Sequence, residues 1–66
     1  MSLRMRDLKQ FVGSSCSVTW KSRLGREHGK VLNVLDVSYA PPFGAYLVGD
    51  VEDVRLERLM NIHPLD

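Results

Sequence analysis

The stretch Ser14-Ser15-Cys16-Ser17-Val18-Thr19-Trp20-Lys21 alternates between apolar and polar side chains. Cys16, Val18 and Trp20 fall on one side of an extended chain, and small or charged residues fall on the other. An alternation with a period of two is typical of a half-buried β-strand. We therefore predict a strand over 14–21 with its apolar face directed toward a core.

A polar segment separates this strand from a second one. Ser22–Gly29 is mostly polar or charged and includes Gly25 and Gly29, which indicates an exposed hairpin tip. Lys30–Tyr39 is rich in valine and predicts the returning strand. Both faces of this strand carry apolar residues. It is therefore expected either to bend, as in a small barrel, or to meet a partner with its second face.

Shorter elements are expected on either side of the hairpin. Met5–Val12 has the apolar spacing of one or two helical turns, and Ala40–Gly44 contains two prolines that interrupt the sheet. Ala45–Val48 predicts a third strand. Val54–Leu59 fits either a fourth strand or a helical turn, and Asn61–Asp66 fits a short closing strand or a tail.

These elements predict an all-β fold, a small SH3-like antiparallel barrel of four to five strands with a short N-terminal helical turn. Residues 1–66 form one such domain, and residues 1–4 are expected to be disordered or to precede a natural start near Met5. An open four-stranded sheet that dimerises is the alternative. Ser22–Arg26 should be exposed. The side chains expected to be buried are Val18, Trp20, Val31 and Val48.

Length and composition exclude several classes of protein. With 44% hydrophobic residues and a net charge of +1, the chain is not expected to be disordered. No apolar run is long enough to cross a membrane, and no signal peptide is visible. The single cysteine, Cys16, excludes an internal disulfide, so a cytoplasmic setting is expected. A chain of this length buries only about 60% of its unfolded surface, which favours a homo-oligomer.

The small net charge conceals a strong asymmetry along the chain. Residues 1–30 contain seven Lys or Arg against two acids, whereas residues 31–66 contain two against six. Such a chain can bind a polyanion on one side or associate head to tail with a second copy.

Two sets of residues are candidates for binding. The basic hairpin residues would contact nucleic acid, RNA in particular, through its phosphates; they are Lys21, Arg23, Arg26 and Lys30. Three aromatic residues around the proline-containing loop would instead anchor a protein partner or an assembly; they are Tyr39, Phe43 and Tyr46.

The sequence contains no catalytic constellation, and it predicts no metal site and no cofactor. Cys16, His28 and His63 lack the spacing of a zinc site, and no phosphate-binding glycine motif is present. A non-enzymatic protein is therefore expected. The rival hypothesis is a small oligomeric enzyme whose site lies on a symmetry axis, with Tyr46 and Lys30 as its best candidates.

The segment Gly25–Val34, preceded by Val18-Thr19-Trp20 and followed by Tyr46–Val51, resembles a KOW motif. The matching positions are Gly29, Lys30, Val31 and Val34. The resemblance covers about half of the chain and implies the SH3-like fold of domains found in ribosomal proteins and transcription elongation factors. The sequence departs from the motif in having three residues between Gly25 and Gly29, and in its Pro41-Pro42 insertion.

A second resemblance involves the C-terminal part. Val54–Leu59, before Asn61, is similar to the closing segment of the plasmid-borne, trimethoprim-resistant dihydrofolate reductases, which are small SH3-like chains that work as tetramers. The pore segment of that family, Val-Gln-Ile-Tyr, has no counterpart in this sequence. The resemblance therefore implies the fold and not the activity.

Overall fold

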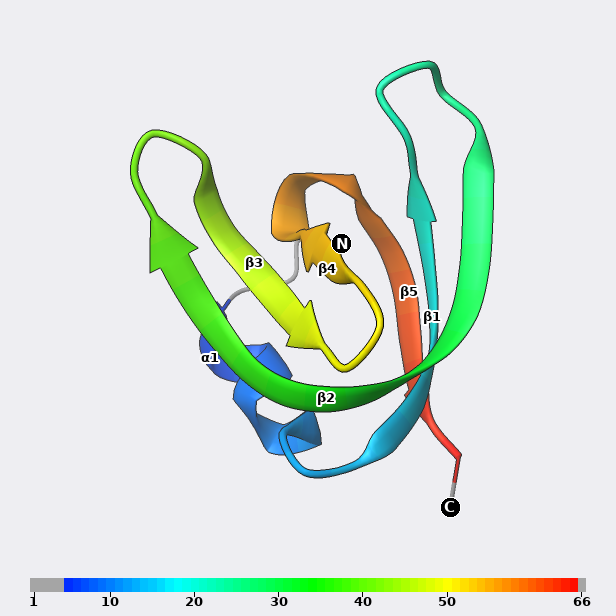
Figure 1. The fold of residues 1–66 in the computed structure, drawn as a ribbon, viewed down its shortest axis with the longest axis vertical. Helices are drawn as coiled ribbons and strands as arrows, with labels where there is room; N and C mark the ends of the chain where they lie inside the picture. The colour runs from blue at the N-terminus through cyan, green and yellow to red at the C-terminus, as the bar shows by residue number, and fades with distance from the viewer. Residues whose placement is uncertain (1–4, 66) are drawn as a thin grey trace.

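Five antiparallel strands form one strongly curled sheet in the order β4-β3-β2-β1-β5 (Figure 1). The computed structural model describes residues 5–65, so the prediction about residues 1–4 lies outside the described residues. The strands are β1 (Ser15–Lys21), β2 (Glu27–Ala40), β3 (Gly44–Gly49), β4 (Asp53–Arg55) and β5 (Leu59–Pro64). The predicted small antiparallel all-β fold is confirmed. The edge strands β4 and β5 are not hydrogen-bonded neighbours, so the sheet curls without closing.

Short helical segments complete the fold. At the N-terminus, α1 (Met5–Leu8) continues into the 3-10 helix η1 (Lys9–Phe11), which confirms the predicted helical turns. The Leu8 side chain is fully buried, so α1 packs on the core. The segment that fitted either a strand or a helical turn contains both, because β4 is followed by the 3-10 helix η2 (Leu56–Arg58). No helix within residues 5–65 has the length and apolarity needed to span a membrane.

The long strand β2 bends at a β-bulge. Val34 pairs with Gly49 and Asp36 pairs with Val48, which leaves Leu35 as an extra residue opposite β3. A bulge shifts the alternation of a strand by one residue. Val34 before the bulge and Val37 after it therefore both face the core, whereas Leu35 is exposed. Of the two explanations for apolar residues on both faces, the bend is thus present in the structure.

One continuous core lies inside the curl. Val18 and Trp20 are buried there as predicted, but Val31 is 60% exposed, and its predicted burial is wrong. Val31 pairs with Ser17 on the outer face of the sheet, while its neighbour Leu32 pairs with Cys16 on the inner face. Val48, also predicted to be buried, is only half-buried, because it pairs with the exposed residues Asp36 and Asp53 on the outer face. The buried hydrophobic residues are Leu8, Cys16, Val18, Trp20, Leu32, Val34, Val37, Leu47, Val54 and Ile62.

A polar network joins the two halves of the sheet. The Asn33 backbone N–H donates to Asp50 Oδ1 at 3.0 Å, and the Asn33 side-chain amide donates to Asp50 Oδ2 at 2.8 Å. The Ser15 hydroxyl donates to Asn33 Oδ1 on the same side chain. The bonds from Asn33 hold the pKa of the Asp50 carboxyl below its ordinary value. The network ties the β3–β4 turn to β1 and β2.

Candidate functional site

A shallow hollow lies where the turn between β2 and β3 meets β4. The strand register determines which side chains form the floor of the hollow. Tyr46 on β3 pairs with Ser38 on β2 and with Arg55 on β4. Side chains directly opposite in an antiparallel sheet point to the same face. Asp53, two residues before Arg55, is on that face as well. The buried residue Val54 lies between them and faces the core.

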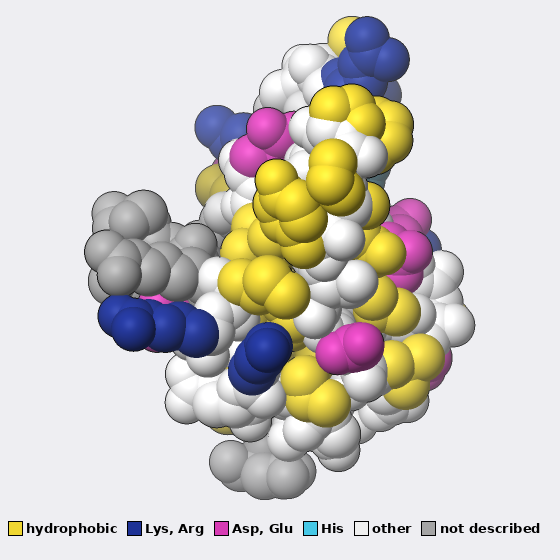
Figure 2. Space-filling model, turned by 90° about the vertical axis from the view of Figure 1, so that its left-hand side faces the viewer, with side chains coloured by type: hydrophobic (Ala, Val, Ile, Leu, Met, Phe, Trp, Pro, Cys, Tyr) yellow, Lys and Arg dark blue, Asp and Glu magenta, His cyan; other side chains and the backbone are white. Residues whose placement is uncertain are grey.

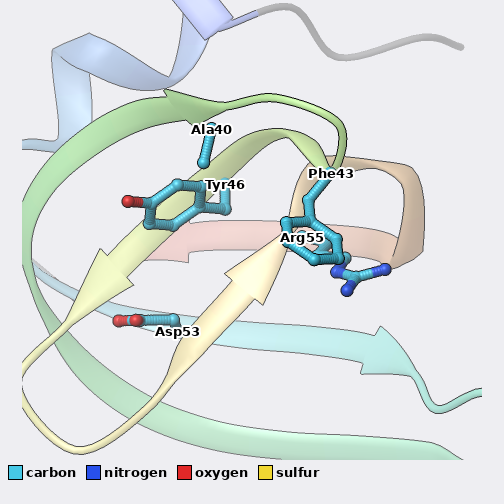
Figure 3. A pocket seen from close by; sticks show the side chains of 5 residues that line it. All are labelled: Ala40, Phe43, Tyr46, Asp53 and Arg55. Carbon is cyan, nitrogen blue, oxygen red and sulfur yellow. The ribbon is translucent and has the colours of Figure 1, made fainter.

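The hollow has a volume of about 320 Å³ and is lined by five side chains (Figure 3). They are Ala40, Phe43, Tyr46, Asp53 and Arg55. In Figure 3 the Tyr46 ring lies between Ala40 and Asp53, and Phe43 reaches down from the turn beside Arg55. The hollow thus combines two aromatic rings with one group of each charge.

The two charged groups of the hollow differ in how they are engaged. The Arg55 Cζ lies 4.7 Å from the centre of the Phe43 ring, a cation–π contact, and the Arg55 Nη1 lies 3.4 Å from Glu57 Oε1. Asp53 is exposed and forms no ion pair with any side chain of residues 5–65. The carboxylate of Asp53 is therefore the charge that the hollow offers to a ligand.

The face of the molecule that carries the β2–β3 turn exposes hydrophobic side chains. Figure 2 views the side of the molecule that carries the β2–β3 turn, and hydrophobic side chains gather along the middle of that face with charged groups mostly around them. The turn contributes Pro41, Pro42 and Phe43, all exposed, and Phe43 is 57% exposed. Exposed clusters of this kind mark interaction surfaces more often than isolated apolar residues do.

The three predicted partner-binding residues lie on two different faces of the sheet. Phe43 and Tyr46 line the hollow together, but Tyr39 pairs with Ala45 on the opposite face of the sheet. Ala40, Asp53 and Arg55, which also line the hollow, were not predicted from the sequence. The alternation Asp53-Val54-Arg55, with one apolar residue between two charged ones, could have indicated a strand that presents both charges on one outer face.

The basic hairpin protrudes from the body of the sheet at the end of β1 (Figure 1). We call residues Ser22–Arg26 the tip. Its backbone is held by bonds from Ser22 N–H to the Arg26 carbonyl at 2.8 Å, from Gly25 N–H to the Ser22 carbonyl at 3.0 Å, and from Arg26 N–H to Ser22 Oγ at 3.2 Å. The tip is exposed as predicted apart from Ser22, which is half-buried because these bonds fold the chain around it.

The four predicted nucleic-acid-binding residues do not form one face. All four are exposed, and none forms an ion pair with a side chain of residues 5–65. Lys21 pairs with Glu27 on the outer face of the β1–β2 ribbon, whereas Lys30 pairs with Val18 on the inner face. Arg23 and Arg26 lie in the tip between these faces. At most one of the two lysines therefore lies on any one face of the ribbon.

The register also separates Lys30 from Tyr46, the pair named for a symmetry-axis site. Lys30 shares the inner face of β2 with Leu32, while Tyr46 is on the outer face of β3. Within one copy of the chain these two side chains do not converge. Among residues 5–65, no cluster of three or more His, Cys, Asp or Glu side chains is placed to hold a metal ion.

Comparison of the chain with protein-family models, with curated proteins and with solved structures found no match. The resemblances to KOW-motif and dihydrofolate reductase chains stay predictions.

Proposed function

We propose that this protein is a binding module that docks a protein partner in the hollow beside the β2–β3 turn. The observation that carries the proposal is the convergence of Phe43 and Tyr46 on an exposed surface with the Asp53 carboxylate, which has no ion-pair partner among residues 5–65. Aromatic residues held in place by a sheet are frequent anchors of protein interfaces. The volume of the hollow is at the small end of the range for ligand sites, about 300–1,000 Å³, so one or two partner side chains would fill it.

The chemistry of the hollow favours a cationic side chain with an apolar stem. The face of an aromatic ring attracts a guanidinium or an ammonium group, as the contact of Arg55 with Phe43 illustrates within this chain. The methylene groups of an incoming Arg or Lys would pack on Tyr46 while the charged head meets Asp53. An acidic partner would instead bring a second carboxylate beside Asp53.

Selection from a random peptide library displayed on phage tests the proposal. We expect peptides that contain Arg or Lys beside an apolar residue, and we expect Phe43→Ala and Asp53→Asn each to weaken their binding about tenfold. Tyr39→Ala is the matched control, because it removes an exposed aromatic ring from the opposite face. Selected peptides that bind Phe43→Ala and Tyr39→Ala equally well, or no selected peptides at all, would contradict the proposal.

A second candidate function is weak binding of RNA by the hairpin. The protrusion and the exposure of its four cations favour it. Three simultaneous phosphate contacts give a slope of log K against log salt of about −2 to −3. Filter binding at two salt concentrations measures this slope, and no retention of RNA at about 50 mM salt would exclude this function.

A further inference from the structure

The tip carries an exposed apolar residue between two cations. Leu24 is 86% exposed, more than any other large hydrophobic residue described, and Arg23 and Arg26 beside it are exposed too. The hydrogen bonds of Ser22 fix the backbone of this turn before any partner arrives. An apolar side chain held at the end of a protrusion between two guanidinium groups has the chemistry that the hollow favours.

The margin of the hollow is complementary in charge to the tip. Asp53 lies on its floor, Glu57 reaches Arg55 at its side, and Asp36 lies two strands away on the same face, since both Asp36 and Asp53 pair with Val48. Within residues 5–65, Arg55 is already paired with Glu57, whereas Asp53 and Asp36 have no ion-pair partner. The two arginines of a tip would therefore meet these two carboxylates, and Leu24 would meet the aromatic rings.

We propose that the partner docked in the hollow is a second copy of this chain, which inserts its hairpin tip. This inference rests on the proposed function of the hollow as a docking surface. It also accounts for the opposite charges of the two halves of the sequence. The tip belongs to the basic half, the acids beside the hollow belong to the acidic half, and the two would attract each other between copies.

The free edge of β5 is poorly suited to self-association by strand pairing. The bond from Leu65 N–H to the Ser15 carbonyl places the backbone groups of residues 61, 63 and 65 toward β1, so those of 62 and 64 point outward. The outward N–H of Ile62 already donates to Asn61 Oδ1 at 3.0 Å, and Pro64 has no N–H. Such capping is a common means of blocking edge-to-edge pairing. Strand pairing along the β5 edge is therefore disfavoured.

The proposed contact is heterologous. In Figure 1 the tip and the β2–β3 turn lie at the two ends of the curved strand β2, at the upper right and the upper left, so one copy can donate its tip to one neighbour and receive the tip of another. Repetition of such a contact produces a ring when the rotation closes and an open chain when it does not.

Sedimentation of two complementary variants tests the inference. The tip variant is Arg23→Glu with Arg26→Glu, and the hollow variant is Phe43→Ala with Asp53→Asn. We expect wild type to associate at micromolar concentration, and each variant alone to associate at least about tenfold more weakly. Their equimolar mixture should form a 1:1 dimer, because the intact tip of the hollow variant fits the intact hollow of the tip variant. The control, Arg6→Glu with Lys9→Glu, makes the same charge change on the exposed N-terminal segment and should associate like wild type.

Each other outcome overturns the inference. A monomeric wild type at about 1 mM would show that no second copy docks. A tip variant that associates like wild type, or two defective variants that fail to form a dimer when mixed, would show that association does not join tip to hollow. If wild type is monomeric but still binds selected cationic peptides in a Phe43-dependent manner, the hollow is a docking surface for another protein. Failure of both experiments would remove the proposed function as well.

Discussion

The two hairpin turns that flank β2 use similar backbone chemistry for opposite purposes. Each contains a glycine at positive φ, Gly25 at 82° before β2 and Gly44 at 87° after it, a conformation that other residues rarely adopt. The tip around Gly25 extends into solvent and leaves Leu24 without packing. The turn before Gly44 instead brings Phe43 over Arg55 on β4. One turn therefore provides a protrusion, and the other provides one wall of a hollow.

The largest expected difference is in the free energy of unfolding, between a substitution at the base of the protruding tip, where Trp20 lies, and one at its apex, Leu24. Trp20 at the base is 9% exposed and stacks on His28 with ring centroids 5.8 Å apart. Trp20→Ala should lower the free energy of unfolding by about 3–5 kcal/mol, because it leaves a cavity in the core. Leu24→Ala at the apex should change it by less than about 0.5 kcal/mol. Urea unfolding measures both, and similar losses would contradict the distinction between base and apex.

The network that joins the two halves of the sheet should make stability depend on pH. The lowered pKa of Asp50 means that its ionised form is favoured by folding, so this stabilisation is present above the ordinary carboxyl pKa. It is lost as the pH falls through the lowered pKa. We expect Asp50→Asn to be less stable than wild type at neutral pH, and the difference to shrink toward acidic pH. Unfolding at several pH values measures it, and a constant difference would contradict the role of Asn33 as donor.

The cation–π contact between Phe43 and Arg55 in the wall of the hollow should give a modest coupling free energy for folding. A double-mutant cycle of Phe43→Ala and Arg55→Ala is expected to give about 0.5–1 kcal/mol, the range for an exposed cation–π contact. Glu57→Ala is the control for the ion pair of Arg55, which is expected to contribute less, because exposed ion pairs are screened by solvent. A coupling near zero would mean that Phe43 is not held over Arg55 in solution.

The smallest expected effect on stability concerns the tip arginines. Arg23→Ala with Arg26→Ala should leave the free energy of unfolding within about 0.5 kcal/mol of wild type. If the hairpin binds RNA, the same change should remove about 1.5–2 units of the salt slope, because two phosphate contacts are lost. Filter binding measures the slope, and an unchanged slope would place any RNA contact away from the tip.

The hairpin could be predicted from the sequence because its signals are local. The alternation over Ser14–Lys21 and the glycines of the polar segment depend on neighbouring residues only. The exposure of Val31 could not be predicted in the same way. It depends on the bulge at Leu35, which shifts the alternation along β2 and is set by pairing with β3.

The hollow could be predicted only in part for the same physical reason. Phe43 and Tyr46 stand out because exposed aromatic residues near a proline-containing loop suggest a binding surface. Asp53 and Arg55 lie beside them because of the register in which β4 pairs with β3. The local sequence pattern does not indicate which segment pairs with β3, or in which register. Tyr39 looks equivalent to Tyr46 in the sequence, yet the register places it on the other face.

The contact between tip and hollow can be observed directly by paramagnetic relaxation enhancement between copies. A spin label attached at Lys21→Cys, beside the tip, leaves Leu24 and both tip arginines unchanged, and the buried Cys16 thiol stays in place. Mixed with isotope-labelled wild type, it should broaden the amide signals of Phe43, Tyr46 and Asp53 in the other copy. Broadening centred on Met60 and Ile62 of β5, or none at concentrations where the chain associates, would contradict the account.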